Sequence, residues 1–451
     1  MRIMPAVGRC GSGTTDGARQ LAPAAEAPSD AAPTQVTRRL ARAAATQDTF
    51  ITGALLALQS TLVKLCGPPV GLVRITKVSL SVFELPAITR RFRLQDTGTA
   101  SRPRWERRLE PHGLEAVQVM HVETDEGIEG VCTVGDARYT CMDARVLEQL
   151  RLLALGEDPL ARERLLHKLS VATRQMFAPP GWFGTFDNCL WDIAGKVSGR
   201  SVATLLGNAR TQSEVYYNIA GATLEDCLQD ADRAIGLGFR ALKDHFTDRE
   251  GRGDFPAFER MRHRFPTVVL MHDAALADYD RAAALETGLA LEELGYHWFE
   301  EPLSDRDFRG LRELCERLRL PVLAGETLMH DFELLSEWLC GGAVDLIRGN
   351  ARHGTTAITR LAALARSRST TLELNGPGGL FGLVHAQLCC GLENVGRYEY
   401  FPNGSRDTIG LEIGMTNPPL PTGGSISPAP GPGWGAEWDW ERFRTRRIAV
   451  L

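Results

Sequence analysis

Three acidic residues in the second half of the chain each lie at the end of a short apolar segment. Asp273 follows VVLMH, Glu300 ends YHWFE, and Glu326 follows PVLA and a glycine. A single such residue is usually a helix cap or a surface charge, but three carboxylates that converge repel one another. A divalent cation relieves that repulsion, and carboxylate oxygens suit Mg²⁺. Asp273, Glu300 and Glu326 are therefore candidate ligands of a magnesium ion.

A lysine and a histidine follow a similar segment earlier in the chain. The segment FRALK ends at Lys243, and Asp244 and His245 come next. Side chains alternate along a strand, so Lys243 and His245 face one side and Asp244 faces the other. Beside a metal that binds a substrate carboxylate and stabilises an enediolate, such a pair indicates proton transfer. The ammonium and the cation are expected to lower the pKa of His245, which leaves a neutral base at about pH 7. The alternative is a histidine that packs at the end of a strand without a chemical role.

Eight short apolar segments at a regular spacing are expected to position these residues. They lie at 215–219, 239–243, 268–272, 296–300, 321–324, 344–348, 370–374 and 397–400. Their starts are 23 to 29 residues apart, and most intervals carry an amphipathic helical pattern. Strands that alternate with helices predict parallel pairing, and eight of them predict a (β/α)-barrel over residues 211–402. Active sites of such barrels lie at the carboxyl ends of the strands, so the candidate residues share one rim.

The segment before the barrel has a different pattern. RITKVSLSVFEL alternates like a strand, and AVQVMHVETDEGIEGVCTVG indicates two strands around a turn at residues 125–127. Residues 88–105 are expected to form a polar loop, and residues 143–210 carry helical patterns. These patterns predict an α+β domain over 74–210, which the tail 403–451 completes. Residues 1–73 have the composition of a disordered leader that folding and activity do not need.

The composition excludes several classes of partner. Lys and Arg number 51 and Asp and Glu 56, and a net charge of −5 gives no indication of a nucleic-acid partner. The longest apolar run, residues 50–63, is shorter than the ~20 residues that span a bilayer. The ten cysteines include no CxxC pair, which argues against zinc ribbons and favours a reducing, cytoplasmic location. We expect a homo-oligomer that acts on a small-molecule carboxylate, with no nucleic-acid or membrane partner.

Several motifs together resemble the enolase superfamily, specifically its mandelate racemase/muconate lactonizing enzyme-like branch. They are ETDEGIEG, LWDIAGKVSGRSVATLLG, FRALKDH, VVLMHDA, WFEEPLSD, PVLAGET and GPGWGAEWDW, and the similarity covers residues 74–451. The resemblance implies an α+β capping domain on a modified (β/α)7β TIM-type barrel. It also implies bound Mg²⁺ and abstraction of a proton α to a carboxylate. Asp273, Glu300 and Glu326 match the metal-ligand positions of the family, and Lys243 and His245 match its Lys-x-Lys positions.

The sequence departs from that branch after the sixth and seventh strands. Asn350 and Asn375 stand where the branch often carries an Asp and a His. An amide cannot carry a proton as an imidazole does, so the second base is missing unless His353 or Arg352 replaces it. Glu399 matches a glutamate that hydrogen-bonds the substrate carboxylate. Asn350, Asn375, His353 and Glu399 are thus candidate substrate-binding residues.

Three functions are compatible with this pattern. A dehydratase of a hydroxy acid, such as an acid sugar, needs one base and is favoured. A racemase or epimerase normally needs two bases, whereas a cycloisomerase needs one. A non-catalytic member would explain the two asparagines but not the retained Lys, His and acidic residues. The loops at 88–105 and 135–146 are expected to select the substrate, and the arginines of the first suit an anionic ligand or simply a solvated surface.

Overall fold

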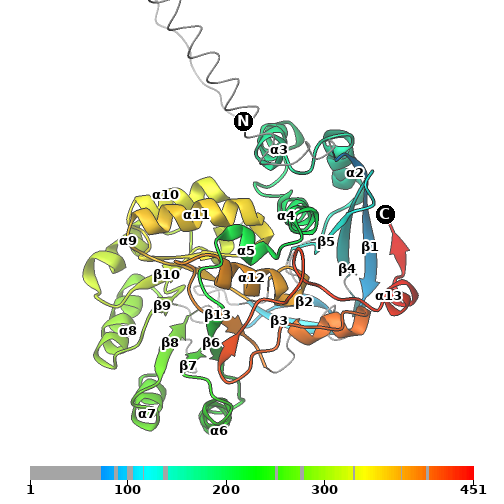
Figure 1. The fold of residues 1–451 in the computed structure, drawn as a ribbon. Coiled ribbons are helices and arrows are strands. Elements are labelled where there is room, and N and C mark those ends of the chain that lie inside the picture. Colours follow the sequence, from blue (N-terminus) through cyan, green and yellow to red (C-terminus); the bar gives the residue numbers. More distant parts are fainter. Residues whose placement is uncertain are drawn as a thin grey trace, which may run out of the picture. The chain divides into compact units, whose positions relative to one another are not determined.

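Eight parallel strands in the described part of the chain form a barrel (Figure 1). They are β6 (Ser213–Asn218), β7 (Ala241–Asp244), β8 (Val269–Asp273), β9 (Phe299–Glu300), β10 (Val322–Ala324), β11 (Leu346–Gly349), β12 (Leu372–Leu374) and β13 (Tyr398–Tyr400). Each strand from β6 to β12 pairs with the next, and β13 pairs with β6. One bridge, between Leu372 and Val395, links β12 to the segment before β13. The sheet therefore nearly closes, as the spacing of the apolar segments predicted.

The computed structural model describes residues 73–451 except 86–89, 99–104, 115, 136–140, 249–251, 275–278, 329–330, 377 and 403–405. The predicted leader thus lies outside the described residues, apart from residue 73. None of the described helices has the length and apolar character needed to cross a bilayer.

Helices follow the barrel strands in order. They are α6 (Leu224–Gly236), α7 (Phe255–Arg264), α8 (Arg281–Glu293), α9 (Phe308–Arg317), α10 (Phe332–Cys340), α11 (Thr355–Ser367) and α12 (Leu383–Gly391). Side chains of Asp254, Asp280, Asp307 and Asp331 accept hydrogen bonds from the first-turn N–H groups of α7 to α10. Such caps satisfy backbone donors that have no partner within the helix. Short 3₁₀ turns follow three strands, at η1 (Glu326–Leu328), η2 (Ala351–His353) and η3 (Leu380–Gly382), and η4 (Arg406–Ile413) lies in the tail.

Apolar side chains fill the lower part of the barrel interior. Tyr216, Ala241, Met271, Trp298 and Leu323 form a buried cluster separate from the main core. The rings of Tyr216 and Trp298 meet edge to face at 5.5 Å. Because side chains alternate along each strand, the next inward positions lie one layer closer to the carboxyl ends. Polar and charged residues occupy that layer.

A four-stranded antiparallel sheet precedes the barrel in sequence. It consists of β1 (Ile75–Glu84), β4 (Ala116–Thr124), β5 (Glu129–Thr133) and the C-terminal β15 (Ala449–Val450), in the order β15-β1-β4-β5. Helices α2 (Ala144–Ala154), α3 (Arg162–Met176), α4 (Gly184–Ser198) and α5 (Val202–Leu206) follow β5. Near the C-terminus, β14 (Ser425–Ile426) pairs with β6, and α13 (Trp440–Arg446) precedes β15.

The prediction of a polar loop at 88–105 is wrong for residues 90–96 and 105, which lie in strands. Strands β2 (Arg90–Asp96) and β3 (Trp105–Leu114) form a separate antiparallel hairpin there. The Oδ1 of Asp96 accepts a hydrogen bond of 2.9 Å from the N–H of Gly98, which turns the chain after β2. The charged residues of RRFRLQD favoured the prediction of a loop and obscured the alternation typical of a strand. Arginines can nevertheless occupy every second position of a strand whose other face is apolar.

Helix α4 attaches the first domain to the barrel by capping α11. The residue before α11 is Gly354, which has no side chain to cap the helix. Instead, Asn188 Oδ1 accepts from the N–H of Thr355 at 2.9 Å, and Asp187 Oδ2 accepts from that of Thr356 at 2.7 Å. Gly184 allows this approach, because a Cβ there would collide with the backbone at Arg352. Asp187 and Asn188, just before the motif LWDIAGKVSGRSVATLLG, therefore link the two domains.

The pH dependence of unfolding should report on this cap. Burial raises the pKa of Asp187 to about 6, although bonds from Thr356 oppose the rise. Since the folded state binds this proton more tightly than the unfolded chain, its stabilising contribution is present at low pH and is lost as pH rises through about 6. Relative to Asp187→Asn, the wild type should lose up to about 3 kcal/mol of unfolding free energy between about pH 4 and pH 7.

Urea denaturation of both proteins across that range measures the difference. Asp307→Asn is the control that should change little over this range, because the Arg281 side chain lowers the pKa of Asp307 and its linked stability changes mainly below about pH 4. Parallel pH profiles for wild type and Asp187→Asn would contradict the assignment.

Candidate active site

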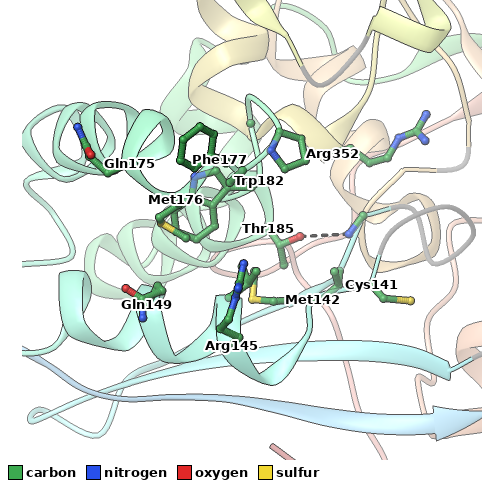
Figure 2. Close-up of a pocket in the computed structure, with 16 residues that line it drawn as sticks. Cys141, Met142, Arg145, Gln149, Gln175, Met176, Phe177, Trp182, Thr185 and Arg352 are labelled. Carbon is green, nitrogen blue, oxygen red and sulfur yellow. Dashed lines mark hydrogen bonds between the residues drawn. The ribbon is translucent and has the colours of Figure 1, made fainter. Parts of the chain in front are cut away.

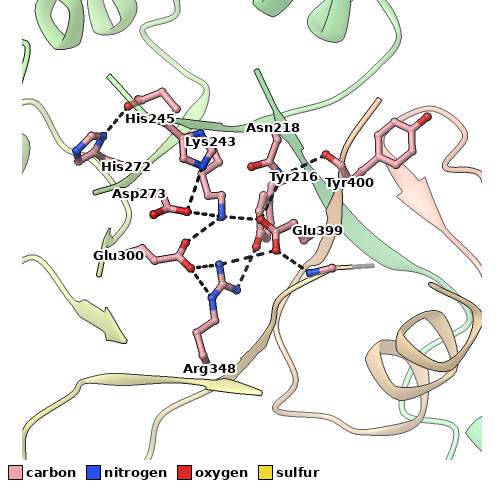
Figure 3. Close-up of polar contacts among 12 residues, drawn as sticks. Tyr216, Asn218, Lys243, His245, His272, Asp273, Glu300, Arg348, Glu399 and Tyr400 are labelled. Carbon is pink, nitrogen blue, oxygen red and sulfur yellow. Dashed lines mark hydrogen bonds and ion pairs between the residues drawn. The ribbon is translucent and has the colours of Figure 1, made fainter. Parts of the chain in front are cut away.

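Charged residues from different strands meet at Lys243 inside the barrel (Figure 3). The Nζ of Lys243 lies 3.0 Å from Asp273 Oδ2 and 3.1 Å from Glu300 Oε2. It also lies 2.5 Å from Glu399 Oε1. All four side chains are buried. Burial opposes the charged ammonium, but the three carboxylates outweigh it, and the pKa of Lys243 lies well above its usual value.

His245 lies beside Lys243 and shares one of its partners. Its Nε2 is 3.1 Å from Asp273 Oδ2, and its side chain is 28% exposed, unlike the rest of the cluster. Asp244 faces the opposite side, where its carboxylate contacts the Nδ1 of His272 at 2.7 Å. The alternation expected along this segment is therefore present, and His245 is the member of the cluster nearest to solvent.

The pKa of His245 departs from its usual value in the direction opposite to that expected from the sequence. Burial lowers it and Lys243 lowers it further, but Asp273 outweighs both and the pKa is raised. The reason is the direct contact with Asp273, which the sequence did not reveal. An added cation that bound Asp273 would weaken this effect, since it would neutralise the same carboxylate.

Arg348 on β11 is the site residue that the sequence analysis missed. Its Nε donates to Glu300 Oε1 at 2.5 Å, and its Nη1 donates to the Tyr216 hydroxyl at 3.1 Å. The guanidinium is fully buried and its Nη2 lies 3.9 Å from Glu399 Oε2. Alternation along the strand could have identified it. Every second residue of a barrel strand faces the interior, and Arg348 lies two positions after the inward-facing Leu346.

Glu399 is held as an anion between the two cations. Its Oε2 accepts a hydrogen bond of 2.7 Å from the N–H of Gly376, and its Oε1 accepts one of 3.2 Å from Asn218 Nδ2. Burial alone would raise its pKa, but Lys243 and Arg348 together lower it to about 2. Glu399 thus forms an ion pair with the charged Lys243.

Further acidic side chains gather outside this inner cluster. Glu301 follows β9 with a backbone φ of 47°, a left-handed conformation that is unusual for a residue with a side chain. Burial and the charges of Asp273, Asp305, Glu326 and Glu300, in that order, raise its pKa well above the usual value. Glu326 begins η1 directly after β10 and is part of this group. The rim therefore carries more negative than positive charge.

This donor set fits a divalent cation in its chemistry. The surplus charge consists of carboxylates, which are the ligands that Mg²⁺ prefers. In the described residues, no three His, Cys, Asp or Glu side chains lie close enough together to hold one ion. Asp273 and Glu300 meet at Lys243, whereas Glu326 lies on a separate turn.

Asn350 and Asn375 contact each other where a second base was expected, and His353, one of its two predicted replacements, lines a cavity. Asn350 Nδ2 donates to Asn375 Oδ1 at 2.8 Å, so the two amides bind each other at the ends of β11 and β12. His353 Nδ1 lies 3.0 Å from the carbonyl oxygen of Asn350, and its ring lines a cavity between α3, α4, α10 and α11. Asp187 lines that cavity as well. In the described structure, Lys243 and His245 are thus the amine and imidazole groups placed beside Asp273.

A larger cavity, of about 750 Å³, lies beside α2 and the start of α4 (Figure 2). Gly135, Cys141, Met142 and Arg145 line it, and they belong to the loop that was expected to select the substrate. Arg352, which follows β11, is the barrel's contribution. The loop and the sixth strand of the barrel therefore border the same space.

Comparisons with known proteins agree with this architecture. Residues 226–442 match the family model described as Enolase C-terminal domain-like. A D-galactonate dehydratase family member from Pseudarthrobacter chlorophenolicus is 23% identical over 71% of this chain and 89% of its own length. The arabinonate dehydratase of Saccharolobus solfataricus is 29% identical over 53% of this chain and 66% of its own length.

Solved structures share the fold across both domains. The magnesium complex of D-glucarate dehydratase from Agrobacterium tumefaciens has a TM-score of 0.69 at 24% identity, and covers 83% of this chain and 99% of that one. A racemase from Streptomyces coelicolor with bound magnesium has a TM-score of 0.64 at 22% identity, and covers 83% of this chain and 100% of that one.

Residues 226–442 thus belong to the Enolase C-terminal domain-like family. The fold of the chain is the capping domain and TIM-type barrel of the mandelate racemase/muconate lactonizing enzymes.

Removing Arg348 should expose the cost of a buried carboxylate that has lost one of its two cationic partners. Burial raises the pKa of Glu300, and Arg348 is the strongest of the groups that oppose the rise. Arg348→Met should lower the free energy of unfolding by about 3–5 kcal/mol, because one partner of a buried pair remains charged. The double variant Arg348→Met, Glu300→Gln should regain part of that loss.

Urea denaturation of the metal-free proteins measures these effects. Arg281→Met is the matched control, because Arg281 pairs with Asp307 at the surface and such pairs contribute only about 0–1 kcal/mol. Losses that simply add in the double variant would rule out the coupling.

Proposed function

We propose that this chain is a magnesium-dependent dehydratase that acts on a hydroxy acid of the acid-sugar type. The contact that carries the proposal joins His245 and Lys243 to Asp273 on one side of the barrel mouth. A pair of mutually bonded asparagines, Asn350 and Asn375, lies at the ends of β11 and β12. This arrangement supports proton transfer at one face of a substrate.

Asp273, Glu300 and Glu326 are the residues that would hold the ion. When bound, a divalent cation supplies positive charge for the substrate carboxylate and for the charge that develops on proton removal. The names of the relatives support both the substrate class and the ion, since several are dehydratases of sugar acids and two of the solved structures contain magnesium. A cytoplasmic location and self-association stay predictions from the sequence.

His245 would remove the proton α to the substrate carboxylate. Its exposed edge reaches the barrel mouth, while Lys243 beside it supplies a fixed positive charge for the enediolate. The resulting imidazolium can then donate its proton to the β-hydroxyl as that group leaves. Loss of water gives an enol, which becomes a 2-keto acid.

Incubating the full chain with a panel of sugar acids and Mg²⁺ tests this function. A 2-keto acid should form, and a chelator should abolish its formation until Mg²⁺ or Mn²⁺ is restored. His245→Asn should lower kcat by at least ~10²-fold, the low end of the contribution of general acid–base catalysis. His263→Asn, an exposed histidine on α7, should leave kcat unchanged. Full turnover in excess chelator would sink the metal assignment.

The stereochemistry of exchange separates this function from the alternative of a racemase or epimerase. His245 and Lys243 lie on one strand, so an enediolate would regain its proton from the face that lost it. In D₂O, recovered substrate should carry deuterium at the α-carbon with its configuration retained, as measured by NMR and chiral chromatography. An inverted epimer formed at the rate of turnover would instead favour the racemase alternative, the activity by which the Streptomyces coelicolor structure is named.

A further inference from the structure

The loop after β9 holds the loop after β10 through one buried carboxylate. Asp305 follows β9 by a few residues and is only 4% exposed. Its Oδ1 accepts a hydrogen bond of 2.7 Å from the N–H of Gly325. Its Oδ2 accepts two more at 2.7 Å, from the N–H and the hydroxyl of Thr327. These donors flank Glu326 on both sides along the chain.

The backbone around Glu326 needs such support. Gly325 has a φ of 110°, a region that residues with a side chain rarely adopt, so the chain turns sharply between β10 and η1. The carbonyl oxygen of Asp305 accepts in turn from Trp338 Nε1 at 2.8 Å, which ties Asp305 to α10. The ring of Trp338 packs edge to face on Phe308 at 5.0 Å. Asp305 is thereby fixed at both its backbone and its side chain.

Asp305 adds a carboxylate to an acidic neighbourhood. Asp305 is one of four carboxylates whose charges raise the pKa of Glu301. A neutral side chain would avoid that repulsion, but an amide has one acceptor atom and could not receive donors at both of its polar atoms. Leaving a buried N–H without an acceptor costs about 1–3 kcal/mol. The three hydrogen bonds to residues 325–327 therefore need a carboxylate at this position, despite the added repulsion.

We propose that Asp305 is a positioning residue for Glu326. It holds the peptide groups on either side of Glu326 so that this carboxylate is presented to the divalent cation together with Asp273. The inference rests on the proposed function, because it takes Glu326 as a ligand. It assigns to Asp305 a part in setting metal affinity, beyond the stability of the loop.

Mn²⁺ affinity of the full chain without substrate, measured by electron paramagnetic resonance, tests the inference. Asp305→Asn should weaken Mn²⁺ binding at least about tenfold, in the range found for groups that support metal ligands. Thr327→Val removes one of the three bonds and should weaken binding by a smaller factor. Asp307→Asn is the matched control: Asp307 lies in the same loop but caps α9, so affinity should stay within about twofold of wild type. Melting temperatures identify any variant that fails to fold, and Thr327→Val then carries the test.

A double variant decides whether Asp305 acts through Glu326. Glu326→Gln should weaken Mn²⁺ binding, and adding Asp305→Asn should weaken it no further, because the supported group is already lost. A second, independent loss in the double variant overturns the inference, as does wild-type affinity in Asp305→Asn or in Glu326→Gln. In those cases the proposed function still stands if turnover needs the cation. Failure of the wild type to bind Mn²⁺ overturns both.

Discussion

The burial of charge inside the barrel is the constraint on which the rest of the site depends. Lys243 and Arg348 share this interior with Asp273, Glu300 and Glu399, and each costs several kcal/mol to remove from water unless it is paired. Pairing requires side chains from β7, β8, β9, β11 and β13 to converge inside the barrel. An apolar cluster that includes Tyr216 and Trp298 is buried in the same barrel. The pairing of the buried charges therefore depends on how the strands are aligned with one another.

This balance separates a rigid inner zone from an acidic outer one. The inner carboxylates have cationic partners, whereas Glu301 lies farther out, among acidic side chains whose charges raise its pKa. His245 lies at the boundary, paired with Asp273 but partly open to solvent. A cation and an anionic substrate would meet at that boundary, where negative charge is in excess and a base is within reach.

Much of the fold and part of the site followed from periodicity. Alternation and spacing predicted the barrel and the convergence of Lys243, His245, Asp273 and Glu300, since strand ends in a parallel barrel meet at one rim. The hairpin at β2 and β3 was missed because charged residues obscured its alternation. Arg348 and Asp305 were missed for a related reason: a buried charge is identified by its partners, and those lie far away in sequence. The direction of the His245 pKa shift likewise depended on a distance to Asp273 that no pattern encodes.

The cap that α4 provides to α11 limits how modular this molecule can be. Asp187 and Asn188 belong to the domain before the barrel, yet they satisfy the first N–H groups of a barrel helix that begins with a glycine. A barrel expressed alone would expose those donors beside the ends of β11 and β12. A chimera that exchanged the first domain for another would need an acidic residue followed by an amide at the same place on its own helix. Exchange of the first domain between relatives is thus restricted to partners that keep this dipeptide.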